Sequence, residues 1–142
     1  MNSEWKIELL AAAKRSSEEQ EREFLKLVDQ AYGNCSLDTA RSLLKTYSAE
    51  PDYGTQERVE GVLATAQPEH VTRAILEELP RLMAEAPEWA ESLVGVEVVH
   101  RLDLLAAVAA GMPEDIKECL RQLTEAEEFT EFYPEARKLV IS

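Results

Sequence analysis

The sequence has few of the features that mark membrane, fibrous or disordered proteins. Five glycines and six prolines in 142 residues are too few for a fibrous or disordered chain. The longest apolar run, residues 104–112, contains nine residues including a glycine, far below the ~20 that a membrane-spanning helix needs. The N-terminus lacks the basic start and the uninterrupted apolar stretch of a signal peptide. We therefore expect a cytoplasmic protein that does not associate with membranes.

Cysteine is nearly absent as well. The two cysteines, Cys35 and Cys119, stand singly and form no CxxC motif. Isolated cysteines behave as small apolar side chains, so we expect both to be buried thiols in a reducing compartment. The sequence leaves a disulfide between them open as the alternative.

Recognisable catalytic and metal-binding patterns are missing. The only two histidines, His70 and His100, are thirty positions apart and have no HExxH spacing. The chain contains no GxSxG motif and no Gly-rich phosphate loop, and residues 52–54 lack the alternating oxygens of an EF-hand loop. Paired carboxylates are too common in so acidic a chain to indicate a glycosidase. We expect no enzyme activity, no metal, no cofactor and no small-molecule substrate.

Positive charge is scarce relative to negative charge. The chain carries 28 Asp and Glu against 15 Lys and Arg, a formal net charge of −13. Proteins that bind nucleic acids or anionic membranes use Lys and Arg to neutralise phosphates, so we expect neither partner. A basic protein surface is the natural complement of this charge.

Two stretches carry acids with few bases nearby. In the C-terminal stretch, Glu127, Glu131 and Glu135 are spaced i, i+4, i+8 beside Glu128. This spacing predicts an acidic outer helix face. The inward side would then carry the apolar residues of the stretch, Phe129, Phe132, Tyr133 and Ala136. Such a face is either balanced by a cationic partner or merely solvated.

The second acidic stretch, residues 77–97, contains Arg81 as its only base. Glu77 can pair with Arg81 at i+4, whereas Glu78 and Glu85 share a face with no counter-ion. The candidate partner-binding residues of the two stretches are Glu127, Glu128, Glu131, Glu135, Glu78, Glu85, Glu88 and Glu91.

Apolar residues recur three and four positions apart along almost the whole chain, as in Phe24, Leu27, Val28 and Ala31, which is typical of amphipathic helices. Five of the six prolines precede an acid, which predicts helix starts at residues 51, 68, 87, 113 and 134. We expect about eight short antiparallel helices in one all-α domain, residues 1–142. They form either a compact bundle or a short, irregular HEAT-like array.

Smaller signals refine this scheme. Pro80 lies inside an apolar stripe and predicts a kink or a break. Residues 16–20 and 124–127 resemble capping boxes, and Gly33 and Gly111 occupy positions where a helix ends in a left-handed residue. Residues 96–99 fit a strand or a helix, and we favour a helix. Trp89 is expected in the core, and Trp5 is either a core residue or an exposed contact.

A central block of the sequence is similar to one protein family. Residues 74–82, AILEELPRL, are followed by APEWA at 86–90 and by Leu93. An acidic, helical chain of this length with this block resembles bacterial immunity proteins, the antidotes encoded beside polymorphic and contact-dependent growth-inhibition toxins. The likeness covers residues 23–140, and APEWA is its specific part. The family shares no catalytic residues that would transfer to this chain.

The resemblance implies a monomer that forms a 1:1 heterodimer with a cognate basic toxin domain. The toxin would be a nuclease, with an RNase favoured, and the acidic protein would occupy its cationic surface. The alternative is an acidic helical-repeat adaptor or scaffold that binds a basic protein or peptide and blocks no enzyme.

Overall fold

The computed structural model describes residues 2–50 and 54–142. Their regular elements are all helical, and they contain no strand. The elements are α1 (Ser3–Ala12), α2 (Glu18–Gln30), α3 (Leu37–Leu44), α4 (Thr55–Leu63), α5 (Pro68–Glu85), α6 (Pro87–His100), α7 (Leu102–Ala110), α8 (Glu114–Thr124), α9 (Glu127–Phe132) and the 3₁₀ helix η1 (Pro134–Lys138). The predicted all-α fold class is confirmed.

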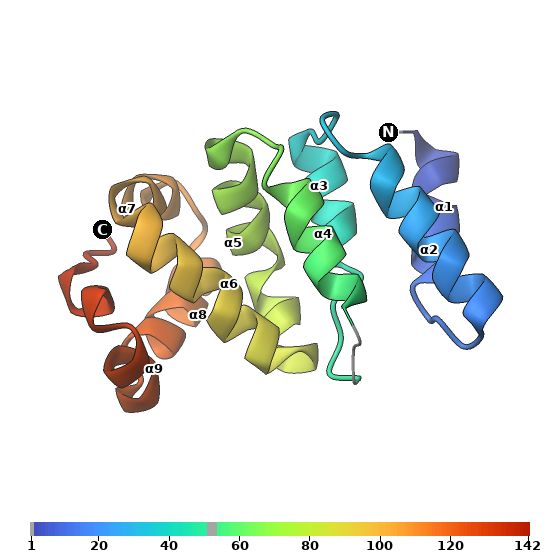
Figure 1. The fold of residues 1–142 in the computed structure, drawn as a ribbon. Helices are drawn as coiled ribbons and strands as arrows, with labels where there is room; N and C mark the ends of the chain where they lie inside the picture. Colours follow the sequence, from blue (N-terminus) through green and yellow to red (C-terminus); the bar gives the residue numbers. More distant parts are fainter. Residues whose placement is uncertain (1, 51–53) are drawn as a thin grey trace.

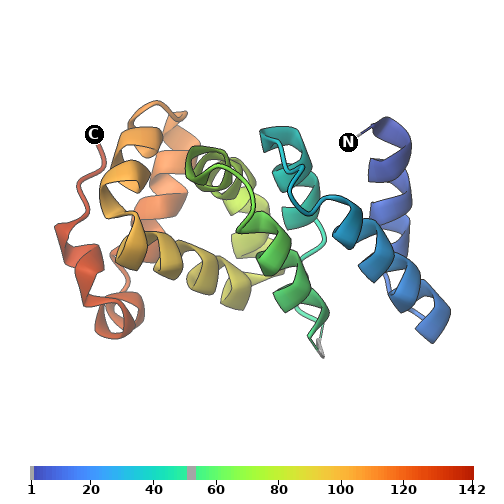
Figure 2. The same cartoon turned by 45° about the horizontal axis from the view of Figure 1, so that its top comes forward.

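The helices follow one another in a row from the N-terminus to the C-terminus (Figure 1). α1 packs against α2, and these two helices contact α3 and α4 respectively. The long helix α5 contacts α3, α6, α7 and α8. The turned view places α1 and α2 at one end and α7 to α9 at the other (Figure 2). The helices of the N-terminal half are therefore arranged as in a helical array. Those of the C-terminal half pack around α5 as a bundle.

The predicted apolar stripes form the core. Phe24, Leu27 and Val28 on α2 are all at most 2% exposed, and buried apolar side chains form one cluster that extends from Trp5 to Ala136. Trp5 is a core residue, since it is 4% exposed and its indole nitrogen donates to the carbonyl of Leu27 at 2.9 Å. Burial of each large apolar side chain stabilises the fold by about 1.5–3 kcal/mol.

The proline–acid pairs mark helix starts as predicted at three positions. α5 begins at Pro68 and α6 at Pro87, and Pro113 is the N-cap of α8. Pro134 also begins a helix, but a 3₁₀ helix of five residues. The fifth predicted start, residue 51, lies outside the described residues.

Pro80 does not break its helix. α5 runs for 18 residues with Pro80 in its interior, so the predicted break is wrong. Proline removes the N–H that would bond to the carbonyl of Leu76. The flanking Leu79 and Leu82 are fully buried, and their packing keeps both sides of the proline in one helix.

The predicted start and end of α2 are confirmed. The Ser17 hydroxyl caps the helix by accepting from the Gln20 amide at 3.1 Å. The Gln20 side chain accepts in return from the Ser16 amide at 2.7 Å, so the reciprocal bond of the capping box is displaced by one residue. Gly33 follows the helix with φ +75°, the left-handed conformation that favours glycine.

Two local predictions are wrong. Thr124 is the last residue of α8 rather than a cap of α9, and its hydroxyl donates to the Leu120 carbonyl at 2.7 Å. α9 instead follows Ala126, which has no side-chain cap. Gly111 does terminate α7, but with φ −91° rather than a left-handed conformation.

Residues 96–99 belong to α6, so the helix prediction is confirmed. Cys35 and Cys119 are both free and half-buried, so the disulfide alternative is wrong. Burial raises the pKa of the Cys35 thiol to about 11. The same cause raises the pKa of Cys119.

Candidate partner-binding surfaces

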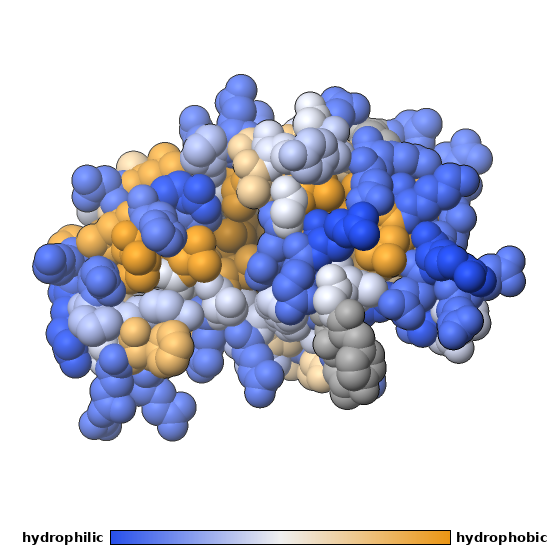
Figure 3. Space-filling model, viewed as in Figure 1, coloured by the Kyte–Doolittle hydropathy of each residue, from blue (hydrophilic) through white to orange (hydrophobic). Residues whose placement is uncertain are grey.

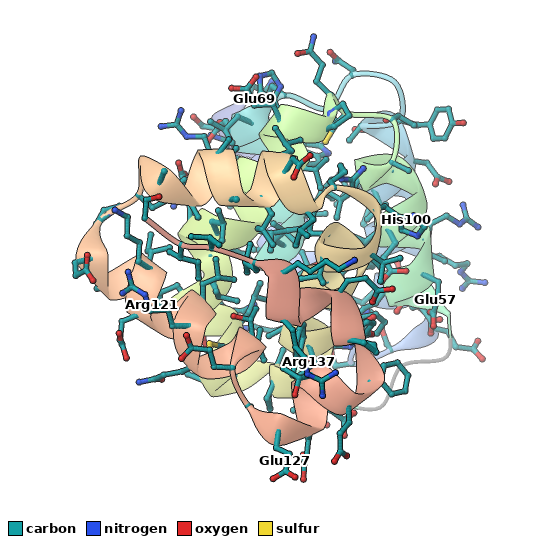
Figure 4. The ribbon with its side chains drawn as sticks, turned by 90° about the vertical axis from the view of Figure 1, so that its left-hand side faces the viewer. Glu57, Glu69, His100, Arg121, Glu127 and Arg137 are labelled. Carbon is teal, nitrogen blue, oxygen red and sulfur yellow. The ribbon has the colours of Figure 1, made fainter. Side chains whose placement is uncertain are left out.

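Three predicted acids gather on α9. Glu127, Glu128 and Glu131 are all exposed. The helix is held to the core by Phe129, which is 3% exposed. Viewed from the C-terminal end, Glu127 projects from the lower tip of the molecule (Figure 4). We call Glu127, Glu128 and Glu131 the α9 acidic patch.

Glu135 does not continue this patch along one helix. α9 ends at Phe132, and Glu135 lies half-buried in η1. The cause is Pro134, because a proline ring disfavours the helical conformation in the residue before it; Tyr133 has φ −123° and ψ 78°. The predicted i, i+4, i+8 face is therefore wrong, and Phe132 is 76% exposed rather than directed inward.

The C-terminal segment is docked on α6 through Tyr133. A Cβ atom at Gly95 would overlap the Tyr133 ring, so the close approach requires glycine at this position. The ring also packs on Phe129, with centroids 4.9 Å apart. Burial, together with the negative charge of Glu91, raises the pKa of Tyr133. Glu91 on α6 thus lies close to the segment that carries the α9 acidic patch.

Glu78 is not available to a partner. Its side chain is 6% exposed, and Arg41 on α3 donates to its Oε2 from Nη2 at 2.8 Å and from Nε at 3.0 Å. Arg41 Nη1 also lies 2.9 Å from Glu77 Oε2. The prediction that Glu78 has no counter-ion is wrong, because the base comes from a helix 37 positions earlier in the chain.

Glu85 is exposed but paired. Arg81 donates to Glu85 Oε2 at 3.0 Å, so the predicted pair between Glu77 and Arg81 is wrong. Glu77 instead binds Arg73 at 2.8 Å, also with i, i+4 spacing. The predicted uncompensated face of Glu78 and Glu85 does not exist.

Glu88 and Glu91 keep their predicted character. Both are exposed at the start of α6, and neither has an ion pair with any described residue. A carboxylate in the first turn of a helix is stabilised by the helix dipole, which accounts for Glu88 without a base. These two residues remain candidates together with the α9 acidic patch.

A groove between α4 and α6 was not predicted. It consists of two cavities of about 620 and 360 Å³, and Ser92 lines both. We call it the α4–α6 groove, and its main residues are Glu57, Glu60, Glu88, Trp89, Leu93 and Val96. Trp89 was expected in the core. It is half-buried, with its ring 5.0 Å from that of Tyr47, and its remaining surface lines the groove.

The Glu60 carboxylate lies in a part of the groove that disfavours its charged form. Burial and the neighbouring Glu57 raise the pKa of Glu60. Both effects oppose the charged form of an acid. The periodicity of α4 does not reveal this, because the burial depends on tertiary packing around α4.

Sequence reasoning also missed the buried carboxylate of Glu97. It is fully buried in α6, where Arg101 Nε donates to it at 2.6 Å and the Thr72 hydroxyl at 3.2 Å. The i, i+4 spacing of Glu97 and Arg101 predicts the pair, but burial and the contact with Thr72 on α5 depend on tertiary packing. This cluster fastens the end of α6 to α5.

The described residues form neither a metal-binding cluster nor a membrane-spanning helix. Within residues 2–50 and 54–142, no three His, Cys, Asp or Glu side chains are placed to hold a metal ion. None of the helices in this part of the chain has the length and apolar character needed to cross a lipid bilayer.

Comparison with known proteins assigns no family. No protein-family model, curated protein or solved structure matches the chain. The resemblance to immunity proteins therefore stays a prediction, and the candidate surfaces rest on their geometry and charge.

Proposed function

We propose that this protein binds a basic protein domain through the α9 acidic patch together with Glu88 and Glu91. We further propose that it is the immunity protein of a bacterial toxin and acts in the cytoplasm. In this account the partner is the cognate toxin domain, and binding covers its cationic surface in a 1:1 heterodimer. The resemblance of the central block to immunity proteins suggests the toxin, and the charge distribution suggests how it is held.

The observation that carries the proposal is the distribution of ion pairs. All four arginines between α5 and α8 bind acids within the molecule: Arg73 to Glu77, Arg81 to Glu85, Arg101 to Glu97 and Arg121 to Glu114. The acids at the start of α6 and on α9 have no ion pair with the described residues. A basic partner can therefore bind these carboxylates without first breaking an ion pair inside the protein.

The chemistry of a nuclease fits this surface. An enzyme that cleaves RNA or DNA carries Lys and Arg where it binds phosphates, and an acidic protein can take the place of the nucleic acid there. Complementary charge also speeds association, which an antidote requires. An RNase remains the favoured activity of the toxin.

A helical adaptor is the second candidate. The row of helix pairs from α1 to α4 (Figure 1) is the kind of arrangement that displays an extended binding surface. An adaptor would bind a basic protein or peptide without blocking an enzyme, so inhibition distinguishes the two candidates.

The proposed function is tested by co-expression with the gene directly upstream. We expect that gene to encode a large toxin whose C-terminal domain stops growth when expressed alone. Co-expression of this protein should restore growth, and the two should purify together at equal stoichiometry. Binding without inhibition would favour the adaptor, and the absence of binding to any basic domain would contradict both candidates.

A further inference from the structure

We propose that the α4–α6 groove receives a basic, amphipathic helical segment of the partner. The segment's apolar side chains would lie on Trp89 and Val96, and its cations would meet Glu57, Glu60 and Glu88. This inference rests on the proposed function only in that the partner is basic. The groove lies on α4 and α6, so it adds a second contact to the α9 acidic patch.

The floor of the groove offers an apolar stripe. Trp89, Leu93 and Val96 are spaced four and three positions apart on α6, so they lie along one side of the helix. Val96 is 47% exposed. Figure 3 shows hydrophobic surface gathered over α6 and α7 and continuing toward the space beside α4.

The walls of the groove are acidic. Glu57 and Glu60 come from neighbouring turns of α4, and Glu88 comes from the start of α6. None of the three has an ion pair with a described residue. Arg101 also lines the groove, but it is bound to the buried Glu97 and therefore does not neutralise the walls.

The shape of the groove favours a segment over a single side chain. The two cavities are neighbours that share Ser92 as a lining residue, and their linings on α6 extend from Trp89 to Val96. An amphipathic helix binds such a groove with anchors at i, i+3 or i+4 and i+7. Apolar anchors flanked by Lys or Arg would match the apolar floor and the acidic walls at the same time.

The first test uses an 18-residue peptide of leucine and lysine in an amphipathic pattern as the probe. The protein is labelled with ¹⁵N, and the indole N–H signals of its two tryptophans are followed during titration. We expect the Trp89 signal to shift, since Trp89 lines the groove. The Trp5 signal should stay in place, because its indole is buried and bonded to Leu27. A Trp89 signal unchanged by the peptide would overturn the groove as the binding site.

The second test separates contact from charge. Val96→Glu places a carboxylate in the groove, and Val99→Glu makes the same change three residues later on α6, where the side chain is 44% exposed and does not line the groove. Both variants make the protein more acidic, so a purely electrostatic interaction would strengthen equally in both. We expect Val96→Glu alone to weaken peptide binding, by roughly fivefold, because it removes apolar contact.

The outcomes are distinct from those of the proposed function. Equal affinities for the two variants, with helicity unchanged by circular dichroism, would overturn the groove contact while leaving the acidic surface intact. A failure of the proposed function would appear separately: the toxin domain would not bind the wild-type protein, while the peptide would still shift the Trp89 indole signal.

Discussion

At the scale of single residues, this acidic protein uses its arginines to hold carboxylates that packing has removed from water. Glu97 is fully buried and Glu78 is 5% exposed, and each is bound by an arginine. A buried carboxylate without its base is costly, because solvent no longer stabilises the charge. Arg41 and Arg101 are therefore required internally, and Arg73, Arg81 and Arg121 are engaged by acids on their own helices. This leaves the exposed glutamates at the start of α6 and on α9 without an ion pair among the described residues.

Replacement of Arg101 by Met tests this requirement. The substitution leaves the Glu97 carboxylate buried with only Thr72 as a described hydrogen-bond donor, and we expect the free energy of unfolding to fall by about 3 kcal/mol. Urea unfolding followed by circular dichroism measures it. The matched control is Arg121→Met, whose partner Glu114 is 75% exposed; because water already solvates this pair, its loss should be far smaller than that of Arg101→Met. Equal losses in the two variants would contradict the account.

The Glu60 carboxyl makes a pH-dependent prediction. Its pKa is raised in the folded protein, so the folded state binds the proton more tightly than the unfolded state. Its contribution to stability is therefore present below the ordinary pKa of glutamate and is lost as the pH rises through the folded pKa. Glu60→Gln should stabilise the protein at pH 7 relative to wild type and lose this advantage in acid. Urea unfolding across this pH range measures the difference, and a constant difference would show that Glu60 titrates normally.

At the scale of elements, the attachment of the C-terminal segment depends on one close contact. α9 is only six residues long, too short to be stable alone. It is held by Phe129 in the core and by the Tyr133 ring on Gly95 of α6. The position of the α9 acidic patch therefore depends on α6.

Gly95→Ala should loosen this attachment. Alanine favours a helix over glycine by about 1 kcal/mol, but here its methyl group overlaps the Tyr133 ring. We expect a net loss of about 1–2 kcal/mol in unfolding free energy and faster hydrogen exchange in residues 127–138. Gly61→Ala on α4 is the control, because its added methyl group meets no atom within 4 Å, and it should stabilise. If both variants stabilise, the contact with Tyr133 does not hold the segment.

The sequence predicts the helices much better than it predicts their partners. The stripe from Phe24 to Ala31 and the starts at Pro68 and Pro87 follow from local spacing and proline geometry, and the structure confirms them. The pairing of Arg41 with Glu78 depends on contact between α3 and α5, which no local pattern contains. The end of α9 was missed for a local reason, because Pro134 constrains Tyr133 more strongly than the apolar spacing favours helix.

At the scale of the whole molecule, the acids that contribute to the net charge of −13 lie on several different sides of the protein. Viewed from the C-terminal end, Glu57 and His100 lie on one side, Arg121 on the opposite side and Glu127 at the lower tip (Figure 4). The proposed basic partner would meet the α9 acidic patch at this tip.

Salt should change the rate of association with the proposed basic partner. Long-range attraction between a net charge of −13 and a basic partner is screened at a Debye length of about 8 Å at physiological ionic strength. Raising the salt concentration should slow association strongly and change dissociation little, as measured by stopped-flow fluorescence. An association rate independent of salt would contradict electrostatic steering.

The most direct test of the account reverses the α9 acidic patch. The variant Glu127→Lys, Glu128→Lys, Glu131→Lys is compared with Glu18→Lys, Glu19→Lys, Glu23→Lys on α2, an equal charge change on exposed residues at the other end of the molecule. The measurement is the dissociation constant for the proposed toxin domain, with helicity checked by circular dichroism. We predict that the α9 variant loses affinity by about tenfold or more and that the α2 variant loses much less. Equal losses would show that only net charge matters, and unchanged affinity in the α9 variant would contradict the claim that this patch binds the partner.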